Sequence, residues 1–315
     1  MELGKKIEVN KQGWIMLTAI MGSDRQIAQC ARTSYGKDGE EYNAERDRKL
    51  IRYMMRHGHT SPFEQAELQF LIYVPMDCWR QWVRHRTASI NEYSTRYSVA
   101  IDEMHEAETW RKQSESNNQG SEGEIEPALA QTLSKAEKAF HEAARNLYNA
   151  RIEAGVAREQ ARKDLPLSTY TRAYWKIDLH NLLHFLKLRL DSHAQLEIRQ
   201  YAEKIAEVIK EAFPITWEAF EDCELNAVKI TATEQKLWPF FLCQQVLESF
   251  SNNEDLKKIL KPDNLIQDID ARIDGIVPPD WKKKKCRERD EFFEKFYKVS
   301  PDLTFCTYDK EESWE

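Results

Sequence analysis

The feature that most constrains the fold is a long, evenly spaced apolar pattern that begins at Pro127. Proline is favoured in the first turn of a helix and glycine just past its end, and Gly155 supplies such a stop. Between them, apolar side chains recur at heptad spacing, at Leu129, Leu133, Ala136, Phe140, Ala143 and Leu147. This spacing predicts one long helix with a structural role.

The rest of the chain mixes strand and helix patterns, which predicts an α+β fold. Apolar and β-branched runs predict strands, and 3.6-residue periodicity predicts helices after Asp24, Pro75 and Asp178. The expected strands cover 14–20, 68–74 and 170–177, and two further helices cover 43–56 and 198–209. The polar residues 87–94 are expected to form an ordered loop. Residues 111–124 lack large apolar side chains, so we expect a mobile excursion there.

The pattern changes near residue 225, so we expect a domain over 1–225 and an extension over 226–315. In the extension, short helical pieces are interrupted by prolines. A lysine run at 282–285 either forms a solvated charged face, because acidic residues follow it, or binds a partner. The sequence does not indicate the role of this extension.

Net charge limits the partners that the chain can bind. With a formal net charge of -7 and a pI near 5.8, the chain as a whole repels polyanions, so any anion site has to be local. Residues 80–97 are an exception, because Arg80, Arg84, Arg86 and Arg96 stand there against a single acid, Glu92. This segment is therefore the first candidate for an anion site.

Two further features of the sequence suggest the cellular compartment of the protein. No apolar run has the length of a signal-peptide core or of the roughly 20 residues that a membrane span requires. The cysteines form no CxxC pair and are expected to be free thiols, at Cys30, Cys78, Cys223, Cys243, Cys286 and Cys306. We therefore expect a cytoplasmic protein that does not contact a membrane.

The scarcity of glycine constrains how a nucleotide could be bound. The chain has 10 glycines and lacks both a GxGxxG turn and a Walker A loop, so side chains would have to hold a nucleotide cofactor. The sequence RHR at 84–86, followed by Ser94 and Arg96, can do so, because guanidinium groups bind phosphate through paired hydrogen bonds. For RHR alone, a solvated basic helix end is the alternative interpretation.

The same segment carries a resemblance to a known family. RHRTASINEYS at 84–94, followed by Arg96 and Tyr97, resembles the signature of flavin-dependent thymidylate synthases. Upstream, HGHTSPFE at 57–64 is similar to a second motif of that family.

Further motifs extend the resemblance. RLDSHAQ at 189–195, with Glu197 and Ile198, is similar to the family's downstream motif, and shorter matches lie at 165–167 and 170–172. Matching pieces extend from about residue 14 to residue 222. Separate motifs in the family's order make the resemblance highly specific.

The resemblance implies the thymidylate synthase-complementing fold, which mixes helices with an antiparallel sheet and assembles as a homotetramer with shared active sites. It implies FAD-dependent methylation of dUMP to dTMP, the methyltransferase step of dTMP biosynthesis. The one-carbon donor would be 5,10-methylenetetrahydrofolate and the reductant NADPH. It implies no metal ion and no nucleic-acid partner. If the enzyme attacked uracil with a cysteine thiol, that cysteine would be expected in one of the matched motifs. None of the cysteines lies in a matched motif.

Residue by residue, the resemblance assigns two ligand sites and one catalytic residue, Arg189. The matching arginine in the family contacts uracil and favours its ionised form, so that carbon 5 can act as the nucleophile. The implied FAD site comprises His59, Ser61, Glu64, Arg84, His85, Arg86, Asn91, Asp178, His180, His184 and His193. The implied dUMP site comprises Gln81, Arg84, Glu92, Tyr93, Ser94, Thr95, Arg96, Arg189 and, from the same or another subunit, Arg162.

Arg189 also stands out without the resemblance. It continues the apolar stripe of Leu182 and Leu186 at helical spacing, and a guanidinium directed inward needs an acceptor or an anionic partner. That partner is either a ligand or an acid such as Asp191.

Other implied site residues have structural interpretations. Arg162 could be an ordinary solvated arginine, and Ser94 could be a turn hydroxyl. His59 and His193 could be structural histidines. At Asp178 and His184 the family often carries asparagine. Both side chains can hydrogen-bond a flavin edge, although an ionised aspartate only accepts.

Two other functions fit parts of the sequence. A module that binds single-stranded nucleic acid would use the arginines of 84–96 with stacking groups at Trp79, Trp82, Tyr93 and Tyr97, although the net charge opposes it. A metal hydrolase would use the His-x-His and His-x3-His spacings of His57, His59, His180 and His184. No HExxH motif accompanies these histidines.

Overall fold

The computed structural model describes residues 2–36, 43–115 and 120–239, together with 273, 276, 291–293 and 295. The chain divides into two compact units, Met1–Ala227 and Val228–Glu315. Because most of the second unit lies outside the described residues, the predicted role and limits of the extension stay predictions. The lysine run at 282–285 also lies outside them.

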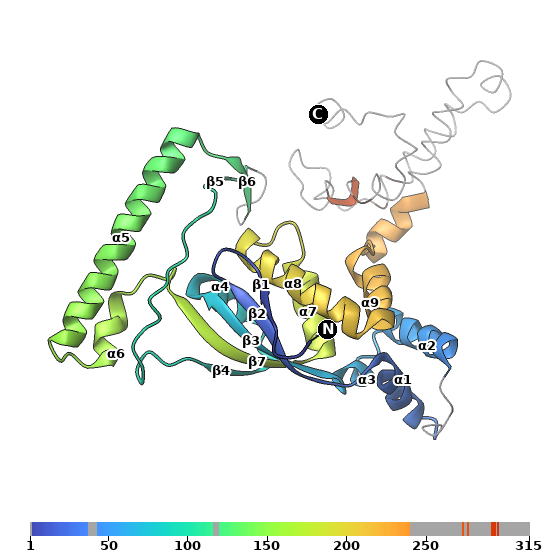
Figure 1. Ribbon diagram of the computed structural model, residues 1–315. Coiled ribbons are helices and arrows are strands. Elements are labelled where there is room, and N and C mark those ends of the chain that lie inside the picture. Colours follow the sequence, from blue (N-terminus) through green and yellow to red (C-terminus); the bar gives the residue numbers. More distant parts are fainter. Residues whose placement is uncertain are drawn as a thin grey trace, which may run out of the picture. The chain divides into compact units, whose positions relative to one another are not determined.

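The first unit is built on a five-stranded antiparallel sheet (Figure 1). Its strand order is β1 (Lys6–Glu8), β2 (Trp14–Met21), β3 (Glu67–Pro75), β7 (Tyr170–Asp178) and β4 (Ser89–Glu92). The central strands β3 and β7 pair along their whole length, from Glu67 opposite Asp178 to Pro75 opposite Tyr170. The three strands predicted from sequence are therefore confirmed as the centre of the sheet.

One face of the sheet is buried and the other is open. Along β7, Ala173, Trp175 and Ile177 are buried, whereas the alternating Arg172 and Tyr174 are exposed, as the two-residue period of a strand requires. The buried face packs against the helices α4 (Met76–Trp82), α7 (Leu179–Arg189) and α8 (Leu196–Ala212).

An aromatic cluster joins the sheet to these helices. The Trp82 ring on α4 lies 4.9 Å from the ring of Phe185 on α7, 5.2 Å from that of Trp175 on β7 and 5.7 Å from that of Tyr201 on α8. All four side chains are fully buried. Large aromatic side chains supply much of the apolar burial in a core, so this cluster fixes how α4 and α7 sit on the sheet.

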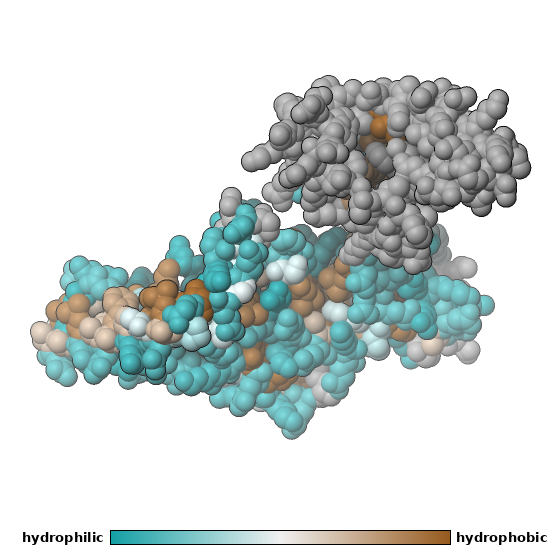
Figure 2. Space-filling model, turned by 90° about the horizontal axis from the view of Figure 1, so that it is seen from above, coloured by the Kyte–Doolittle hydropathy of each residue, from teal (hydrophilic) through white to brown (hydrophobic). Residues whose placement is uncertain are grey.

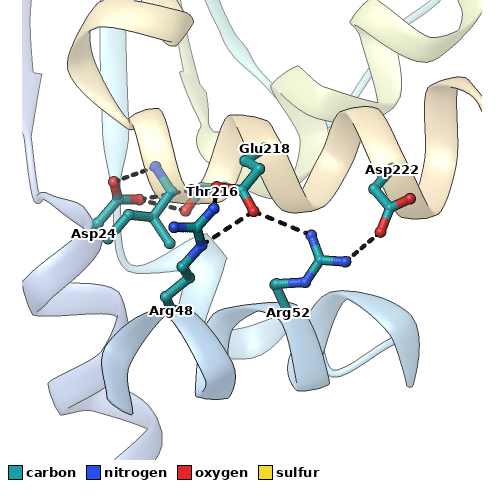
Figure 3. A network of polar contacts seen from close by, with 7 residues as sticks. Asp24, Arg48, Arg52, Thr216, Glu218 and Asp222 are labelled. Atoms are coloured by element: carbon teal, nitrogen blue, oxygen red, sulfur yellow. Dashed lines mark hydrogen bonds and ion pairs between the residues drawn. The ribbon is translucent and has the colours of Figure 1, made fainter. Parts of the chain in front are cut away.

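The helices α1 (Asp24–Thr33), α2 (Ala44–Arg56), α3 (Ser61–Glu64) and α9 (Pro214–Phe220), with a π-helix over Glu221–Leu225, pack together at another part of the unit. Asp24, at the start of α1, joins that helix to α9. Its carboxylate accepts from the backbone N–H groups of Ile215 at 2.8 Å and Thr216 at 3.0 Å, and from the Thr216 hydroxyl at 2.6 Å (Figure 3). These N–H groups belong to the first turn of α9 and have no partner within that helix.

Ion pairs hold α2 against α9 beside this cap. Arg48 and Arg52 on α2 both pair with Glu218, and Arg52 also pairs with Asp222 (Figure 3). These groups are partly exposed, so water and salt screen them and each pair contributes little to stability.

The long helix predicted from sequence is confirmed as α5 (Pro127–Glu153), and Gly155 beyond it has a φ of +80°. The described part of the chain does not cover its heptad face, because all six of the predicted apolar positions are exposed. The Phe140 side chain, for example, is 58% exposed. Figure 2 shows apolar surface along this helix, which contacts mainly α6 (Arg158–Ala161) and the 3-10 helix Arg162–Asp164.

Two expectations about polar segments were wrong. Within 87–94, residues Ser89–Glu92 form the edge strand β4, because their backbone pairs with β7 even though no side chain in the strand is buried. Within 111–124, β5 (Arg111–Gln113) and β6 (Ser121–Glu124) form a hairpin instead of a mobile excursion. A half-buried ion pair, with Arg111 Nη2 at 2.8 Å from Glu197 Oε1, anchors this hairpin to α8.

In the second unit, residues 232–239 are helical. The buried carboxylate of Glu234 accepts from Lys295 Nζ at 2.7 Å and from the backbone N–H of Thr231 at 2.6 Å. The Trp238 ring lies 5.9 Å from the Phe292 ring. Across the described part of both units, no helix has the length and apolarity to cross a membrane.

We predict that Asp24→Ala lowers the free energy of unfolding by about 2 kcal/mol, because it leaves three donors at the start of α9 without their acceptor. Urea denaturation followed by circular dichroism measures this change. The control is Glu45→Ala, which removes an exposed carboxylate paired with Lys49 and should leave the unfolding midpoint unchanged. Equal midpoints for both variants would show that the Asp24 cap contributes nothing measurable.

Candidate active site

The first group of predicted site residues meets where α4 and α7 end. Arg189 Nε donates to His85 Nε2 at 3.1 Å, and the His85 ring lies 6.2 Å from the ring of His184. Four residues before His85, near the end of α4, Gln81 Nε2 donates to Gln195 Oε1. The fold therefore brings the signature segment and the downstream motif together. We call Gln81, His85, His184, Arg189 and Gln195 the Arg189 cluster.

Arg189 carries a charge that no described carboxylate neutralises. The side chain is half-buried, and burial lowers the pKa of its guanidinium. Asp191 is not its partner, because the Asp191 Oδ1 atom accepts from His193 Nδ1 at 2.7 Å and from the His193 backbone N–H at 2.8 Å. The predicted alternative of an Arg189–Asp191 ion pair is therefore wrong.

His85 is neutral in this arrangement. Its Nε2 atom accepts from Arg189, so the ring proton has to be on Nδ1. Burial, with the positive charge of Arg189 and the neighbouring His184, lowers the pKa of His85 to about 4. The contact thus orients the guanidinium of Arg189 without cancelling its charge.

The second group lies after the edge strand β4. Arg162 Nη1 donates to the hydroxyl of Thr95 at 2.8 Å, and the backbone N–H of Arg96 donates to Ser94 Oγ at 3.3 Å. The Arg96 guanidinium lies over the Tyr97 ring, 5.4 Å from its centre. We call Ser94, Thr95, Arg96 and Arg162 the Arg162 cluster. Arg162 reaches this loop from its own chain.

The Arg162 cluster suits a phosphate group. It presents two guanidinium groups, and neither pairs with a carboxylate in the described part of the chain. Hydroxyl and backbone N–H groups lie beside them, which is the donor set that binds phosphate oxygens. Among the contacts of the described residues, none joins this cluster to the Arg189 cluster.

Glu92 and Tyr93, both predicted to bind dUMP, hold the loop in place. The Glu92 carboxylate accepts from the Trp79 indole N–H at 3.0 Å and from the Thr171 hydroxyl at 2.8 Å. The Tyr93 hydroxyl donates to the backbone oxygen of Val99 at 2.7 Å. These contacts tie the loop to α4 and β7, and direct ligand contact by either side chain stays a prediction.

Three of the histidines predicted to bind FAD line one cavity of about 150 Å³, namely His59, His180 and His184. Its other walls are largely apolar and include Met54, Met55, Phe63, Leu183 and Phe220. Lys187 and Glu224 also line the cavity and form an ion pair with each other. Imidazoles set in an apolar wall can hydrogen-bond the edge of a flat aromatic ligand while the wall packs on its faces.

Asp178 has a clear local role as the N-cap of α7. Its Oδ1 atom accepts from the Asn181 backbone N–H at 2.9 Å, and its Oδ2 atom accepts from Asn181 Nδ2 at 2.8 Å. Because an N-cap acceptor satisfies an unpaired N–H of the helix, the residue is accounted for without a ligand. Its contact with FAD stays a prediction.

The other residues predicted to bind FAD are solvent-exposed, and the structure brings them into no single cluster. They are Ser61, Glu64, Arg84, Arg86, Asn91 and His193. Sequence reasoning did not assign a role to Gln195, although its place in the downstream motif was a usable signal. It also missed the apolar cavity walls, whose helical periodicity resembles that of ordinary core residues.

No set of three or more His, Cys, Asp or Glu side chains in the described ranges is arranged to hold a metal ion. The rings of His57 and His59 lie 6.5 Å apart, and each also contacts the Tyr53 ring. Aromatic packing therefore accounts for their proximity.

Comparisons with known proteins show which family the chain resembles. Residues 16–215 match the family described as thymidylate synthase complementing protein. The flavin-dependent thymidylate synthase of one Thermus thermophilus strain is 48% identical over 244 residues, which cover 77% of this chain and 88% of that protein. The flavin-dependent thymidylate synthase of Dictyostelium discoideum is 47% identical over 218 residues, 67% of this chain and 70% of that protein.

A solved structure shows the same relationship. The UMP/dUMP methylase PolB of Streptomyces cacaoi, bound with 5-Br dUMP, superimposes with a TM-score of 0.63 and 32% sequence identity, over 70% of this chain and 99% of PolB. The family match spans most of the first unit, and the three main sequence motifs fall within it. The chain therefore belongs to the thymidylate synthase complementing protein family and is a flavin-dependent thymidylate synthase.

Proposed function

We propose that this protein is a cytoplasmic enzyme of dTMP biosynthesis that methylates dUMP, with FAD as its cofactor. In the overall reaction, dUMP, 5,10-methylenetetrahydrofolate, NADPH and a proton give dTMP, tetrahydrofolate and NADP⁺. The observation that carries the proposal is the half-buried Arg189 guanidinium, which is oriented by a neutral imidazole and keeps its full charge.

Arg189 would act on the uracil ring. A guanidinium beside a uracil oxygen stabilises negative charge in the ring, and that charge makes carbon 5 nucleophilic. The group is most effective if it is held in place before the reaction and is shielded from water, as the contact with His85 and the partial burial provide.

Two of the described cysteines, Cys78 and Cys223, are poorly suited to attack uracil. Cys78 is buried, and burial, with Asp77 and Glu197 nearby, raises the pKa of its thiol. Burial and the adjacent Asp222 also raise the pKa of Cys223. Since the thiolate is the reactive form, these two residues are poor nucleophiles, which supports a route through Arg189.

The residues present fit FAD. The cavity with His59, His180 and His184 offers apolar walls and ring nitrogens to a flavin, and the exposed Arg84 and Arg86 offer charge to its phosphates. When bound, FAD would carry the two electrons from NADPH that convert the transferred methylene to a methyl group.

The assembly that we propose is a homotetramer with shared sites. Two observations support it: the apolar face of α5 is exposed in the single chain, and the Arg189 and Arg162 clusters make no contact with each other among the described residues. A large exposed apolar face on a helix is typical of a surface that a partner covers. A second copy can cover it and bring the two clusters to one substrate.

The direct test is an anaerobic assay of dTMP formation from dUMP. Reactions lacking methylenetetrahydrofolate, NADPH or FAD show whether each is needed, and UMP in place of dUMP tests the substrate range that the name of PolB indicates. A protein that retains no flavin after loading and forms no dTMP would overturn the proposal.

We predict that Arg189→Ala reduces dTMP formation at least about 100-fold while the flavin content stays unchanged, because the guanidinium acts mainly in the transition state. Single-turnover assays and the flavin absorbance check the two parts. Lys204→Ala, which removes a partly exposed cation on α8, is the control and should keep full activity. Normal turnover by Arg189→Ala would remove this residue from the mechanism.

We predict that Arg162→Ala raises the KM for dUMP about 10- to 100-fold with a smaller effect on kcat, because it removes a charged phosphate contact. Lys163→Ala, an exposed neighbour, is the matched control. Deoxyuridine, which has no phosphate, should bind equally weakly to Arg162→Ala and to the unchanged protein. A difference in deoxyuridine affinity would place Arg162 elsewhere in the site.

We predict that Phe140→Glu shifts the protein to smaller assemblies in light scattering coupled to gel filtration and lowers activity in parallel. A charge on the exposed α5 face would be costly to bury between copies. Lys135→Glu on the same helix changes charge outside the heptad positions and is the control.

A mixing experiment tests the shared site directly. At a dUMP concentration far below the raised KM of Arg162→Ala, refolding Arg189→Ala together with Arg162→Ala subunits should give more activity than the two variants show separately, because some sites would receive both arginines. If each site used a single chain, mixing would add no activity.

A further inference from the structure

The Arg162 cluster joins two segments that are far apart in the sequence. One is the loop 94–100 after β4, and the other is α6 with the 3-10 helix that follows it. Arg162 Nη1 donates to the Thr95 hydroxyl at 2.8 Å, and Arg158 Nη1 donates to the Tyr97 backbone oxygen at 3.0 Å. Arginine side chains are long and mobile, so these two bonds need other contacts that place the segments against each other.

The long helix α5 holds the end of the loop. The backbone N–H of Ala100 donates to the hydroxyl of Tyr148 on α5 at 2.8 Å, and both residues are buried. The loop is closed just before this point, because the Tyr93 hydroxyl donates to the backbone oxygen of Val99 at 2.7 Å. A buried N–H without an acceptor costs free energy, so the Tyr148 hydroxyl fixes where the loop ends.

The same part of α5 holds the segment that carries Arg162. Arg151 follows Tyr148 by three residues, so the two side chains are neighbours on the helix surface. Arg151 Nη1 donates to the backbone oxygen of Ala161 at 3.3 Å, and Arg151 Nη2 lies 2.5 Å from Asp164 Oδ2. Arg162 therefore lies between two points that are anchored to α5, which lies beside α6 (Figure 1).

Tyr148 connects the two segments directly. Ala100, Tyr148 and Ala161 form a small buried apolar cluster that is separate from the main core. Ala100 ends the loop, and Ala161 immediately precedes Arg162. The Tyr148 side chain is close-packed in this cluster, with 4% of its surface exposed, so it sets the spacing between the loop and Arg162.

We propose that Tyr148 is a positioning residue for the phosphate group of dUMP. The inference rests on the proposed function. Tyr148 holds the loop 94–100 against Arg162, so that the hydroxyl, backbone N–H and guanidinium groups of the Arg162 cluster are in place before the phosphate binds. A site that is formed beforehand loses less conformational entropy on binding, which raises its affinity. Arg158 supports the same arrangement through its bond to Tyr97.

The test compares dUMP binding by the FAD-loaded full chain and by Tyr148→Phe. The change removes one buried, uncharged oxygen, so the charges around the phosphate stay the same and the effect comes from the position of the loop. Calorimetry should show the Kd of dUMP rising about three- to tenfold. Turnover at saturating dUMP should stay within about twofold, because the Arg189 cluster is unaltered. Tyr35→Phe, which removes a hydroxyl from a side chain that is 80% exposed, is the matched control and should change neither value.

A double variant separates positioning from general damage. If Tyr148 acts through the Arg162 cluster, Tyr148→Phe in an Arg162→Ala background should raise the Kd of dUMP by less than about twofold, because the phosphate contact that depends on the loop is already lost. If Tyr148 only supports the packing of the chain, the double variant should show the product of the two single increases in Kd.

A second variant covers the case in which melting curves show Tyr148→Phe to be unfolded. Arg158→Ala removes the other contact to the loop from an exposed side chain, and it should raise the Kd of dUMP about two- to fivefold. Lys163→Ala removes an exposed cation from the neighbouring turn and is the control for charge; it should leave the Kd unchanged. Equal Kd values for Arg158→Ala and Lys163→Ala would contradict the proposal.

The outcomes are distinguishable from those of the proposed function. If the unchanged protein does not bind dUMP, or if Arg162→Ala binds it with an unchanged Kd, the proposed phosphate site is wrong, and the role of Tyr148 is wrong with it. If the unchanged protein binds dUMP and Arg162→Ala weakens binding, an unchanged Kd in Tyr148→Phe, or a loss that adds fully to that of Arg162→Ala, would overturn the role of Tyr148 alone.

Discussion

The site depends on the packing of Trp82 against Trp175, Phe185 and Tyr201. These rings lock the end of α4 and the middle of α7 onto one face of the sheet. Arg189 follows Phe185 by one helical turn, and the segment that leaves α4 after Trp82 carries His85. Because interiors are close-packed, neither helix can shift without disturbing the other, so the Arg189–His85 contact is set by the core.

This arrangement explains how a chain with few glycines can bind nucleotides. Glycine-rich turns bind phosphate through backbone N–H groups, which are fixed by the fold itself. Side chains are longer and more mobile, so each needs a partner that restrains it without neutralising it. Arg189 is restrained by a neutral imidazole and Arg162 by a hydroxyl. In both cases the restraining group is neutral, so the arginine keeps the positive charge that would attract an anionic ligand.

Sequence reasoning recovered those parts of the fold that depend on local patterns. The strands at 14–20, 68–74 and 170–177 and the long helix after Pro127 follow from periodicity, and the structure confirms them. It failed for β4, because an edge strand held by backbone pairing to β7 needs no apolar side chains. It also failed for the β5–β6 hairpin, which is anchored to α8 by an ion pair that joins residues far apart in the sequence. Such contacts leave no periodic signal.

The site followed the same division. Motif spacing could nominate Arg189 and His85, but only the fold shows that one donates to the other and that Asp191 serves His193 instead. A hydrogen bond between side chains of two elements depends on how the core places those elements, and the spacing of a motif along the sequence does not record that placement.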